Sequence, residues 1–330
     1  MTDLRFDVLC IGNAIVDVIA DASDEFITGQ GLDKGSMRLI DQAEAVRLYG
    51  EMGPGREVSG GSAGNTAAGL AALGIKTGFI GQVANDELGD IYRHDIESQG
   101  VEFLVPARGD VGATARCLIL VTPDAQRTMN TFLGAAQMLE TAGVDMAAVA
   151  VSGITYLEGY LWDPEAPRAA MEAAIDAAHA AGRRIAFTLS DSFCISRHKA
   201  DFVRLIEEKK IDILFANEAE IAEMAGTEDF HAAVNTFADK VATLVVTRSE
   251  QGAVAVRGAE RAQVPAEAIE RLVDTTGAGD LFAAGFLAGE ARGLGLEKSL
   301  KLGAIAAAEV IQHYGARPEK DLNALAAGIL

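Results

Sequence analysis

Short apolar runs rich in β-branched residues alternate along most of the chain with longer, alanine-rich segments. When helices connect successive strands, the strands run in the same direction, so this alternation predicts an α/β protein with a mainly parallel central sheet. Buried strands are predicted at residues 6–11, 77–80, 149–155, 184–189, 211–216 and 243–247. Helices are predicted at residues 64–73, 167–181, 201–208, 218–225, 231–240, 280–291 and 296–314.

Two stretches, residues 17–41 and 112–133, interrupt the alternation because they contain strand-like pieces with no helix between them. We expect these pieces to pair as a small antiparallel sheet that lies as a flap over the main domain. The pieces are residues 16–20, 36–40, 115–121 and 128–133. With only 7 prolines and no repeat or linker, the chain is expected to form one unit, residues 1–330, with a lid from about 13–45 and 110–134 and an α/β core from the remainder.

The chain carries 28 lysines and arginines against 48 aspartates and glutamates, a formal net charge of −20. Phosphate backbones and anionic lipids repel such a chain, so nucleic acid and membrane surfaces are not expected partners. The longest uncharged stretch, residues 58–75, is too rich in glycine and polar residues for a membrane-spanning helix. Cys10, Cys117 and Cys194 lie far apart and lack a C-x-x-C spacing, which favours a reducing cytoplasm over a disulfide framework or a zinc site.

The sequence VDTTGAGDLFAAGFLAG, residues 273–289, places a glycine turn and an acidic residue at the start of a predicted helix. The free N–H groups of a helix start attract anions, and glycines let an anion approach the backbone, so Gly277, Ala278 and Gly279 form a candidate anion cradle. Asp280 beside it could accept a proton from a hydroxyl that attacks a phosphoryl group held there. A capped helix in which Asp280 only complements the helix dipole is the alternative.

Two further motifs are suited to a ligand rich in hydroxyl groups. In SGGSAGNTAAGLAALG, residues 59–74, Gly61 and Asn65 offer an open backbone and a side-chain amide, although small residues there could also serve close helix packing. In IGNAIVDV, Asn13 and Asp17 follow the first strand, where open α/β sheets bind ligands, and Asp17 could accept from a vicinal diol. A turn asparagine and a solvated aspartate are the alternative for that pair.

The sequence ILFANEAEIAEM runs from a predicted buried strand into Asn217 and Glu220. Asn-x-x-Glu at a helix start is itself a capping box, and that structural role competes with one in holding magnesium-bound water or phosphate. Neither G-x-G-x-x-G nor G-x-x-x-x-G-K-[ST] occurs in the chain, so Rossmann dinucleotide binding and P-loop chemistry have no support.

Taken together, the motifs resemble the ribokinase-like, or PfkB, family of sugar and nucleoside kinases. The resemblance spans nearly the whole chain through GNAIVDV, GGSAGNT, GQVANDELG, NEAE and DTTGAGDLFAAGFL. It implies a three-layer αβα fold with a small β-sheet lid. Within the family, the chain is most similar to the adenosine kinases, through QRTMNTFLGAA, LEGYLW, TLSDSFCIS and IDILFANEAE.

The resemblance implies ATP-dependent phosphorylation of the 5′-hydroxyl of a ribonucleoside, adenosine first, with Mg²⁺ and potassium as the expected ions. A sugar kinase of the same family, acting on ribose, fructose or a keto-deoxy acid, is the alternative. A non-catalytic nucleoside-binding protein is disfavoured, because a pure binder needs no carboxylate beside an anion cradle. The chain would act as a monomer or a homodimer in the cytoplasm.

Several residue roles are implied by the same resemblance. Asp280 would be the general base, the amides of residues 277–279 would stabilise the transferring phosphoryl group, and Arg127 on the flap would reach the phosphate. The ribose would be held by Asp17, Gly61 and Asn65 with Asn13 nearby, and ATP would lie along Asn217, Thr247, Gly252, Gly277 and Gly279. Asn217 and Glu220 would organise magnesium and its water, and Asp274 and Thr276 would bind the monovalent cation. A purine would fit an apolar slot of Met129, Leu133, Tyr160 and Phe193, for which an ordinary core is the alternative.

The chain departs from the family at the loop after the strand that ends at Thr247. Family members commonly have T-x-G-x-x-G there, whereas this chain has Thr247-Arg248-Ser249-Glu250-Gln251-Gly252, with serine at the first glycine position. If that position requires a positive φ, Ser249 carries a conformational cost beside the expected nucleotide site.

Overall fold

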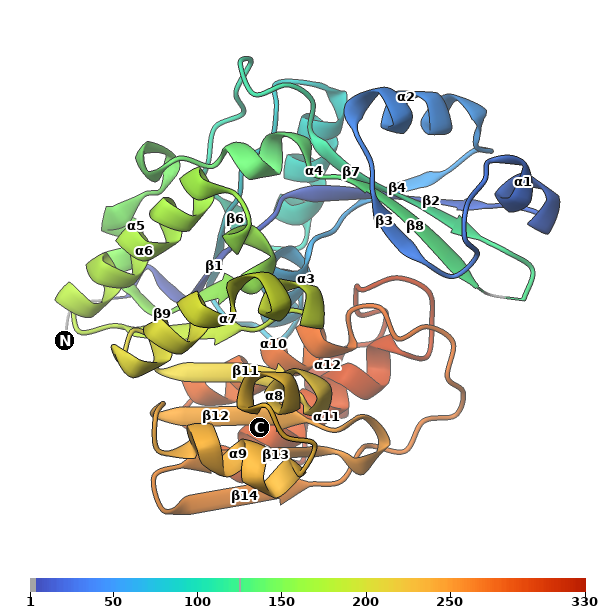
Figure 1. The fold of residues 1–330 in the computed structure, drawn as a ribbon. Helices are drawn as coiled ribbons and strands as arrows, with labels where there is room; N and C mark the ends of the chain where they lie inside the picture. Colours follow the sequence, from blue (N-terminus) through green and yellow to red (C-terminus); the bar gives the residue numbers. More distant parts are fainter. Residues whose placement is uncertain (1–3, 125) are drawn as a thin grey trace.

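The computed structural model describes residues 4–124 and 126–330, in which a central sheet lies between two layers of helices (Figure 1). Its nine strands have the order β14-β13-β12-β11-β10-β9-β1-β5-β6. They are β1 (Phe6–Ile11), β5 (Thr77–Ile80), β6 (Glu102–Phe103), β9 (Ser152–Glu158), β10 (Arg184–Thr188), β11 (Ile213–Asn217), β12 (Thr243–Thr247), β13 (Ala253–Arg257) and β14 (Glu260–Val264). All neighbouring strands pair in parallel except at one edge, where β12, β13 and β14 pair in antiparallel fashion. The predicted α/β class with a mainly parallel sheet is confirmed.

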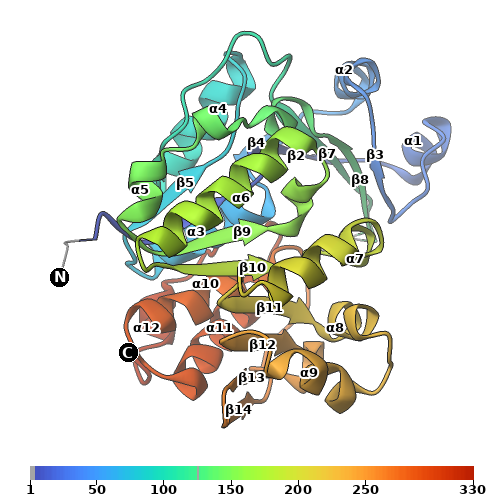
Figure 2. The same cartoon turned by 60° about the vertical axis from the view of Figure 1, so that its left-hand side comes forward.

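Helices cover both faces of the central sheet, which explains why its middle strands are apolar on both sides (Figure 2). One face packs against α3 (Ser62–Ala72), α4 (Glu87–Ser98), α10 (Ala278–Ala291), α11 (Leu296–Val310) and α12 (Leu322–Leu325). The other packs against α5 (Met146–Ala150), α6 (Glu165–Ala180), α7 (Ser192–Glu207), α8 (Glu218–Ala225) and α9 (Phe230–Ala238).

Two predicted elements are displaced by helix caps that the apolar pattern hides. The strand expected at residues 149–155 is wrong in position, because the Asp145 side chain accepts from the Ala148 amide and starts α5, so β9 begins only at Ser152. The helix expected at residues 201–208 is the second half of α7. Asp191 starts that helix earlier by accepting from the Cys194 amide.

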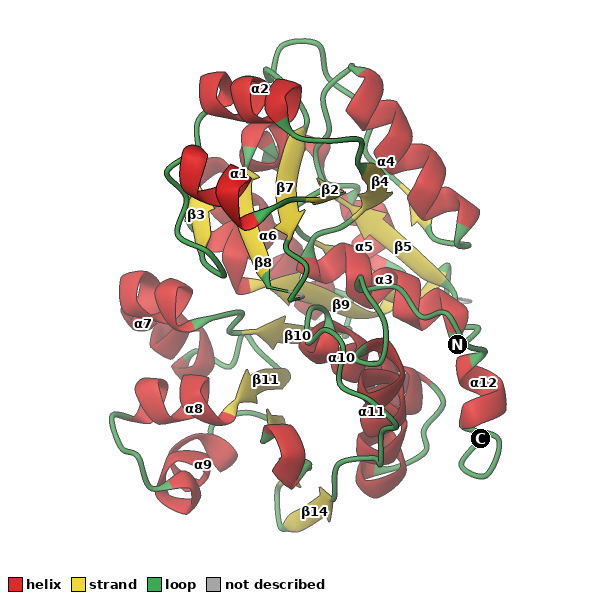
Figure 3. Cartoon of the chain, turned by 90° about the vertical axis from the view of Figure 1, so that its right-hand side faces the viewer, coloured by secondary structure: helices red, strands yellow, loops and turns green. Residues whose placement is uncertain are grey.

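A second sheet of five strands, called the small sheet below, has the order β3-β8-β7-β2-β4 (Figure 3). Its strands are β2 (Ile15–Asp21), β3 (Met37–Leu39), β4 (Arg56–Ser59), β7 (Ala115–Val121) and β8 (Arg127–Phe132). The expected antiparallel pairing is wrong: β2 pairs with β7 and β3 with β8 in parallel, while β7–β8 and β2–β4 are antiparallel. The small sheet also takes β4 from outside the two stretches in which its strands were expected.

Two short helices, α1 (Asp24–Gly29) and α2 (Gln42–Glu51), precede and follow β3. No helix was expected there, but Ser23 and Asp41 cap α1 and α2 with their side chains. The mixed pairing has another cause: each parallel pair, β2 with β7 and β3 with β8, joins strands from two distant segments, so no tight turn between them imposes antiparallel pairing. The side chains of β2 then alternate: Val16 and Val18 pack into the core, and Asp17 lies on the face that lines a cavity.

Small residues bring α3, α10 and α11 close together at the back of that cavity. A Cβ at Gly285 of α10 would lie 2.4 Å from the Leu302 carbonyl oxygen of α11, and one at Gly69 of α3 would lie 2.8 Å from the Ala284 Cβ. The small residues within residues 59–74 therefore do serve close helix packing along α3, which was the alternative to ligand binding. The start of the same helix faces the cavity. In residues 4–124 and 126–330, no helix is both long and apolar enough to cross a membrane.

Candidate active site

The main cavity, of about 730 Å³, lies between the small sheet and the carboxyl ends of strands β1, β9, β10, β11 and β12. This is the edge at which open α/β sheets bind ligands. Sixteen of the predicted site residues line it: Asn13, Asp17, Gly61, Asn65, Met129, Leu133, Tyr160, Phe193, Asn217, Glu220, Thr247, Thr276, Gly277, Ala278, Gly279 and Asp280. Three others, Arg127, Gly252 and Asp274, do not line it.

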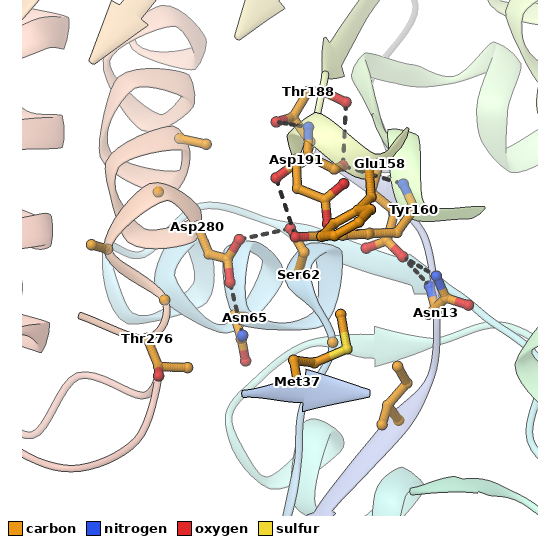
Figure 4. A pocket seen from close by; sticks show the side chains of 18 of the residues that line it. Asn13, Met37, Ser62, Asn65, Glu158, Tyr160, Thr188, Asp191, Thr276 and Asp280 are labelled. Atoms are coloured by element: carbon orange, nitrogen blue, oxygen red, sulfur yellow. Dashed lines mark hydrogen bonds between the residues drawn. The ribbon is translucent and has the colours of Figure 1, made fainter. Parts of the chain in front are cut away.

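Asp280 lies in the first turn of α10 and is held by two side chains of α3 (Figure 4). Ser62 donates to Asp280 Oδ1 at 2.6 Å, and the Asn65 amide donates to Oδ2 at 2.8 Å. Burial raises the pKa of Asp280, and these two hydrogen bonds and the charge of Arg317 oppose that rise. The two contacts fix the orientation of a carboxylate that faces the cavity.

The turn before α10 leaves part of its backbone free to bind an anion. Gly277 has φ +78° and its Cβ would lie 2.5 Å from the Ala316 Cβ, so a side chain is excluded there. The Ala278 amide donates to the Thr275 carbonyl at 3.2 Å and is therefore engaged, unlike the role expected for it. Within the described part of the chain, the amides of Gly277 and Gly279 have no hydrogen-bond acceptor.

The carboxylate of Asp17 meets the start of α3 across a close backbone contact. A Cβ at Gly61, where φ is +80°, would lie 2.2 Å from the Asn13 carbonyl oxygen, and one at Gly60 would lie 2.4 Å from Asp17 Oδ2. Burial raises the pKa of Asp17 to about 7, and the charges of Arg317 and Arg127 counteract it. The glycines are needed because any side chain would push these segments apart.

Glu158, at the end of β9, is a site residue that the sequence reasoning missed. Its Oε1 accepts from the Asn13 amide and Nδ2, both at 2.6 Å, and its Oε2 accepts from the Ala63 amide at 2.7 Å. It is fully buried, and burial raises its pKa to about 7. A glutamate at the carboxyl end of a buried strand, in LEGYLW, is the signal that could have identified it.

Arg127, the first residue of β8, lies against the loop that leads into the anion cradle. Its Nη2 is 2.7 Å from Asp274 Oδ2, and its Nη1 donates to Thr276 Oγ1 at 3.2 Å. Nη2 is therefore ion-paired with Asp274, whereas Nε is buried without an acceptor among the described residues. One N–H group of this buried cation is available for an anion, and a second could be exchanged from Asp274.

Asp274 is surrounded by donors. Oδ1 accepts from the Thr276 amide at 3.1 Å and from Thr276 Oγ1 at 2.8 Å, and Oδ2 accepts from the Gly315 amide at 3.1 Å. With Arg127 also on Oδ2, both oxygens are engaged. A potassium ion that uses this side chain would compete with the Arg127 guanidinium.

The apolar slot opens to solvent and is not core. Tyr160 is 38% and Phe193 69% exposed, and across the slot the β3 residues Met37 and Leu39 are 46% and 60% exposed. Met37 and Leu39 were not predicted, although their alternation in a strand-like piece was a signal. The Tyr160 ring is fixed because its hydroxyl donates to the Ser190 carbonyl at 3.1 Å and its amide to Ser190 Oγ at 3.2 Å.

Asn217 and Glu220 form the capping box of α8 and also line the main cavity. The Asn217 amide donates to Glu220 Oε2 at 3.0 Å, and its Nδ2 donates to Oε1 at 2.7 Å. Burial, reinforced by the nearby Asp191 carboxylate, raises the pKa of Glu220 to about 7. The structural role is therefore realised, and the buried Glu220 carboxylate lies beside the cavity near the half-buried Asp191 carboxylate.

The comparisons with known proteins agree with this geometry. The sequence profile described as "pfkB family carbohydrate kinase" matches residues 6–322. The chain belongs to the pfkB family. The resemblance found in the motifs is thereby confirmed, and the chain is a kinase that transfers phosphate to an alcohol group.

Relatives within the pfkB family include both nucleoside and sugar kinases. The adenosine kinase of Saccharomyces cerevisiae is 27% identical over 93% of this chain and 95% of its own length. The crystal structure of adenosine kinase from Sinorhizobium meliloti is 48% identical with a TM-score of 0.91, and it covers 99% of this chain and 100% of that one. A probable sugar kinase from Rhizobium etli CFN 42 is also 48% identical, with a TM-score of 0.92 and the same coverage.

The loop that departs from the pfkB pattern does carry the positive φ considered above. Ser249 has φ +48°, in the left-handed region. Gly252 has φ +84°, and a Cβ there would lie 2.0 Å from the Val264 carbonyl oxygen, so Gly252 shapes the loop against β14 from outside the cavity. Thr247 is the residue of this loop that lines the main cavity.

Replacing Ser249 with glycine is expected to stabilise the protein by about 0.5 kcal/mol, because the relief of left-handed strain exceeds the entropy that glycine loses on folding. Urea unfolding would measure the change. Ser98→Gly, at the last residue of α4, is the control, since glycine there is expected to destabilise by about 0.5 kcal/mol. A lower stability of Ser249→Gly would show that the loop has no strain to relieve.

Proposed function

We propose that this pfkB kinase transfers the γ-phosphoryl group of ATP to the 5′-hydroxyl of adenosine. The observation that carries the proposal is that one cavity joins the Asp280 carboxylate and the free cradle amides to an open slot bounded by Tyr160 and Phe193. A purine offers a flat apolar face that suits such a slot, whereas a sugar alone would leave it unfilled. The adenosine kinases among the relatives support the same substrate.

In this proposal the ribose lies between the slot and Asp280. Asp17 accepts from the two ring hydroxyls, and the Gly61 backbone allows the ribose to approach closely, with Asn13 fixed behind it by Glu158. The 5′-hydroxyl then points to Asp280, which takes its proton as the oxygen attacks. Ser62 and Asn65 hold the carboxylate so that little motion is needed for this transfer.

The transferring phosphoryl group would be stabilised from two sides. The Gly277 and Gly279 amides supply the partial positive charge of a helix start, and Arg127 supplies a full charge, with its Nε free of an acceptor among the described residues. Arg127 would exchange part of its contact with Asp274 for the phosphate. Because it sits on β8, that exchange would draw the small sheet over the cavity and exclude water, which competes as phosphoryl acceptor.

The residues present fit a divalent cation held mainly by phosphate and water. Asn217 and Glu220 would hold its water ligands, since the Glu220 and Asp191 carboxylates both line the cavity there. Among the residues that the structure describes, no cluster of three or more acidic, histidine or cysteine side chains could chelate a metal directly. When bound, Mg²⁺ would neutralise phosphate charge. A potassium requirement, cytoplasmic location, lack of nucleic-acid partners and a monomeric or homodimeric state stay predictions.

The test is a coupled assay of ADP release over a panel of adenosine, inosine, guanosine, cytidine, ribose and fructose with ATP and Mg²⁺, each with and without potassium. We expect adenosine to give a kcat/KM at least about 10-fold above every other substrate, because a slot that fits one base discriminates by about 1–3 kcal/mol. Higher turnover of a sugar would replace the proposal with the sugar-kinase alternative. Binding of adenosine without ADP release would revive the non-catalytic alternative.

A further inference from the structure

The loop after α11 connects the two halves of the main cavity. At its start, the Ile311 carbonyl accepts from the Val273 amide at 2.9 Å, and its Gly315 amide donates to Asp274, so it supports the approach to the anion cradle. At its end, Arg317 reaches across to the junction of β4 and α3. The sequence analysis assigned no role to this loop.

The Arg317 guanidinium donates hydrogen bonds to two main-chain carbonyls and one hydroxyl. Its Nη1 donates to the Gly64 carbonyl at 2.9 Å, and its Nη2 donates to the Ser59 carbonyl and Oγ at 2.6 and 2.8 Å. These contacts bracket Gly60 and Gly61, the segment that packs against Asn13 and Asp17. Arg317 therefore fixes the backbone on which the proposed ribose site is built.

The positive charge of Arg317 is not consumed in a direct ion pair. Its contacts in the described structure are uncharged, and its Nε is buried without an acceptor. The nearest link to a carboxylate runs through Ser59, whose hydroxyl donates to Asp95 at 2.5 Å. A buried charge without a direct partner acts on other charges in the same low-dielectric region.

The two carboxylates of the proposed chemistry are in that region. The Arg317 charge lowers the pKa of Asp17 and of Asp280, against the effect of burial on both. The other ionisable groups that influence these sites are Arg127 of β8, Cys117 of β7, Tyr92 and Asp95 of α4, Tyr156 and Glu158 of β9, and Tyr160. Of the groups that act on Asp280, Arg317 is the cation, because Ser62 and Asn65 are neutral.

We propose that Arg317 is a positioning residue of the kinase reaction: it anchors the β4–α3 junction and places a buried positive charge behind the segment that carries the proposed ribose and base sites. The inference deepens the proposed function and rests on the base role of Asp280. In the proposed function, the substrate touches Asp17 and Asp280. Arg317 lies behind Gly61 and acts through these two residues. A purely structural residue would change stability and leave the ionisation of these carboxylates unaltered.

The test compares the pH dependence of kcat in the wild type, Arg317→Gln and Arg317→Lys. Protonation of Asp280 removes the base, so kcat falls as pH decreases through the pKa of Asp280. Glutamine keeps a donor but removes the charge. We expect it to shift the acidic limb of the pH profile, the range in which kcat falls as pH decreases, upward by about one pH unit or more. Lysine keeps the charge and is expected to leave the limb within about 0.3 units of the wild type, with a higher KM for the nucleoside because the fork of hydrogen bonds is lost.

Arg292→Gln is the matched control, because Arg292 also donates to a main-chain carbonyl, that of Leu73, at the far ends of α3 and α10. We expect it to lower thermal stability without moving the acidic limb. An unmoved limb in active Arg317→Gln would overturn the inference, as would equal shifts in the glutamine and lysine variants. Calorimetric binding of adenosine across the same pH range, which reports on Asp17 without turnover, must show the upward shift as well.

This design separates the inference from the proposed function. If the wild type does not phosphorylate adenosine, the proposed function fails, and the pH series is run with the best substrate of the ADP-release panel. If the wild type is active and the limb does not respond to Arg317→Gln, only the role of Arg317 fails.

Discussion

We expect Asp280→Asn to lower kcat by at least about 100-fold while the fold and ATP binding persist, because an amide of the same shape cannot take the proton of the attacking hydroxyl. The side chain keeps its place between Ser62 and Asn65. Its oxygen can accept from Asn65 Nδ2 and its nitrogen can donate to the Ser62 hydroxyl, so both contacts can persist. Steady-state kinetics give kcat, and nucleotide titration with thermal unfolding verifies binding and fold.

The control for Asp280→Asn addresses the helix-dipole alternative. Asp90 also lies in the first turn of a helix, α4, but outside the main cavity. If Asp280 only complemented a helix dipole, Asp280→Asn and the control Asp90→Asn would each lower the stability of the protein by about 0.3–1 kcal/mol, and neither would change kcat. Near-normal kcat in Asp280→Asn would remove Asp280 from the base role.

Arg127→Met is the second large effect and is expected to lower kcat by about 100- to 1000-fold, with a smaller change in the KM for adenosine. The phosphoryl group gains negative charge at its equatorial oxygens during transfer, and removing a pre-positioned donor at such a site typically costs this much. The donors concerned are the buried Nε, which has no acceptor among the described residues, and Nη2, which is ion-paired with Asp274. Arg127→Lys retains the charge and should recover part of the loss.

Loss of Arg127 also leaves the buried Asp274 without its cation, so instability must be separated from loss of chemistry. The double variant Arg127→Met with Asp274→Asn removes both charges and should restore stability without restoring kcat. Arg116→Met, on the neighbouring strand β7 of the small sheet, is a control that should retain activity. Recovery of kcat in the double variant would mean that Arg127 serves only to pair with Asp274.

The central sheet was predictable because its strands carry their signal locally. Residues 6–11, 77–80 and 243–247 are apolar on both faces and bounded by polar residues or glycine, and they form β1, β5 and β12 with those bounds. The edge strand β14 was missed, because the half-exposed Glu260–Val264 lacks a continuous apolar run. The small sheet was predicted as a unit, but its parallel pairs join strands from distant segments, and local patterns do not reveal the direction of such pairing.

The candidate site was predictable where glycines and acids cluster in one segment. Asp280 and Asn65 stand in such clusters, and the structure brings them together. Glu158 and Arg317 stand alone in the sequence, and each acquires its partners only from segments far along the chain, Asn13 for one and Ser59 for the other. The ion pair of Arg127 was missed for the same reason, because its partner Asp274 lies 147 positions further along the chain.

The contacts that build the main cavity close very long loops of chain. Ser62 and Asp280 are 218 positions apart, Asn13 and Glu158 are 145 apart, and Arg317 and Ser59 are 258 apart. Loop closure over such distances is slow and must wait until both ends of the central sheet have formed. During refolding, helical content should therefore return before catalytic activity, and the recovery of turnover would report the completed topology of the whole chain.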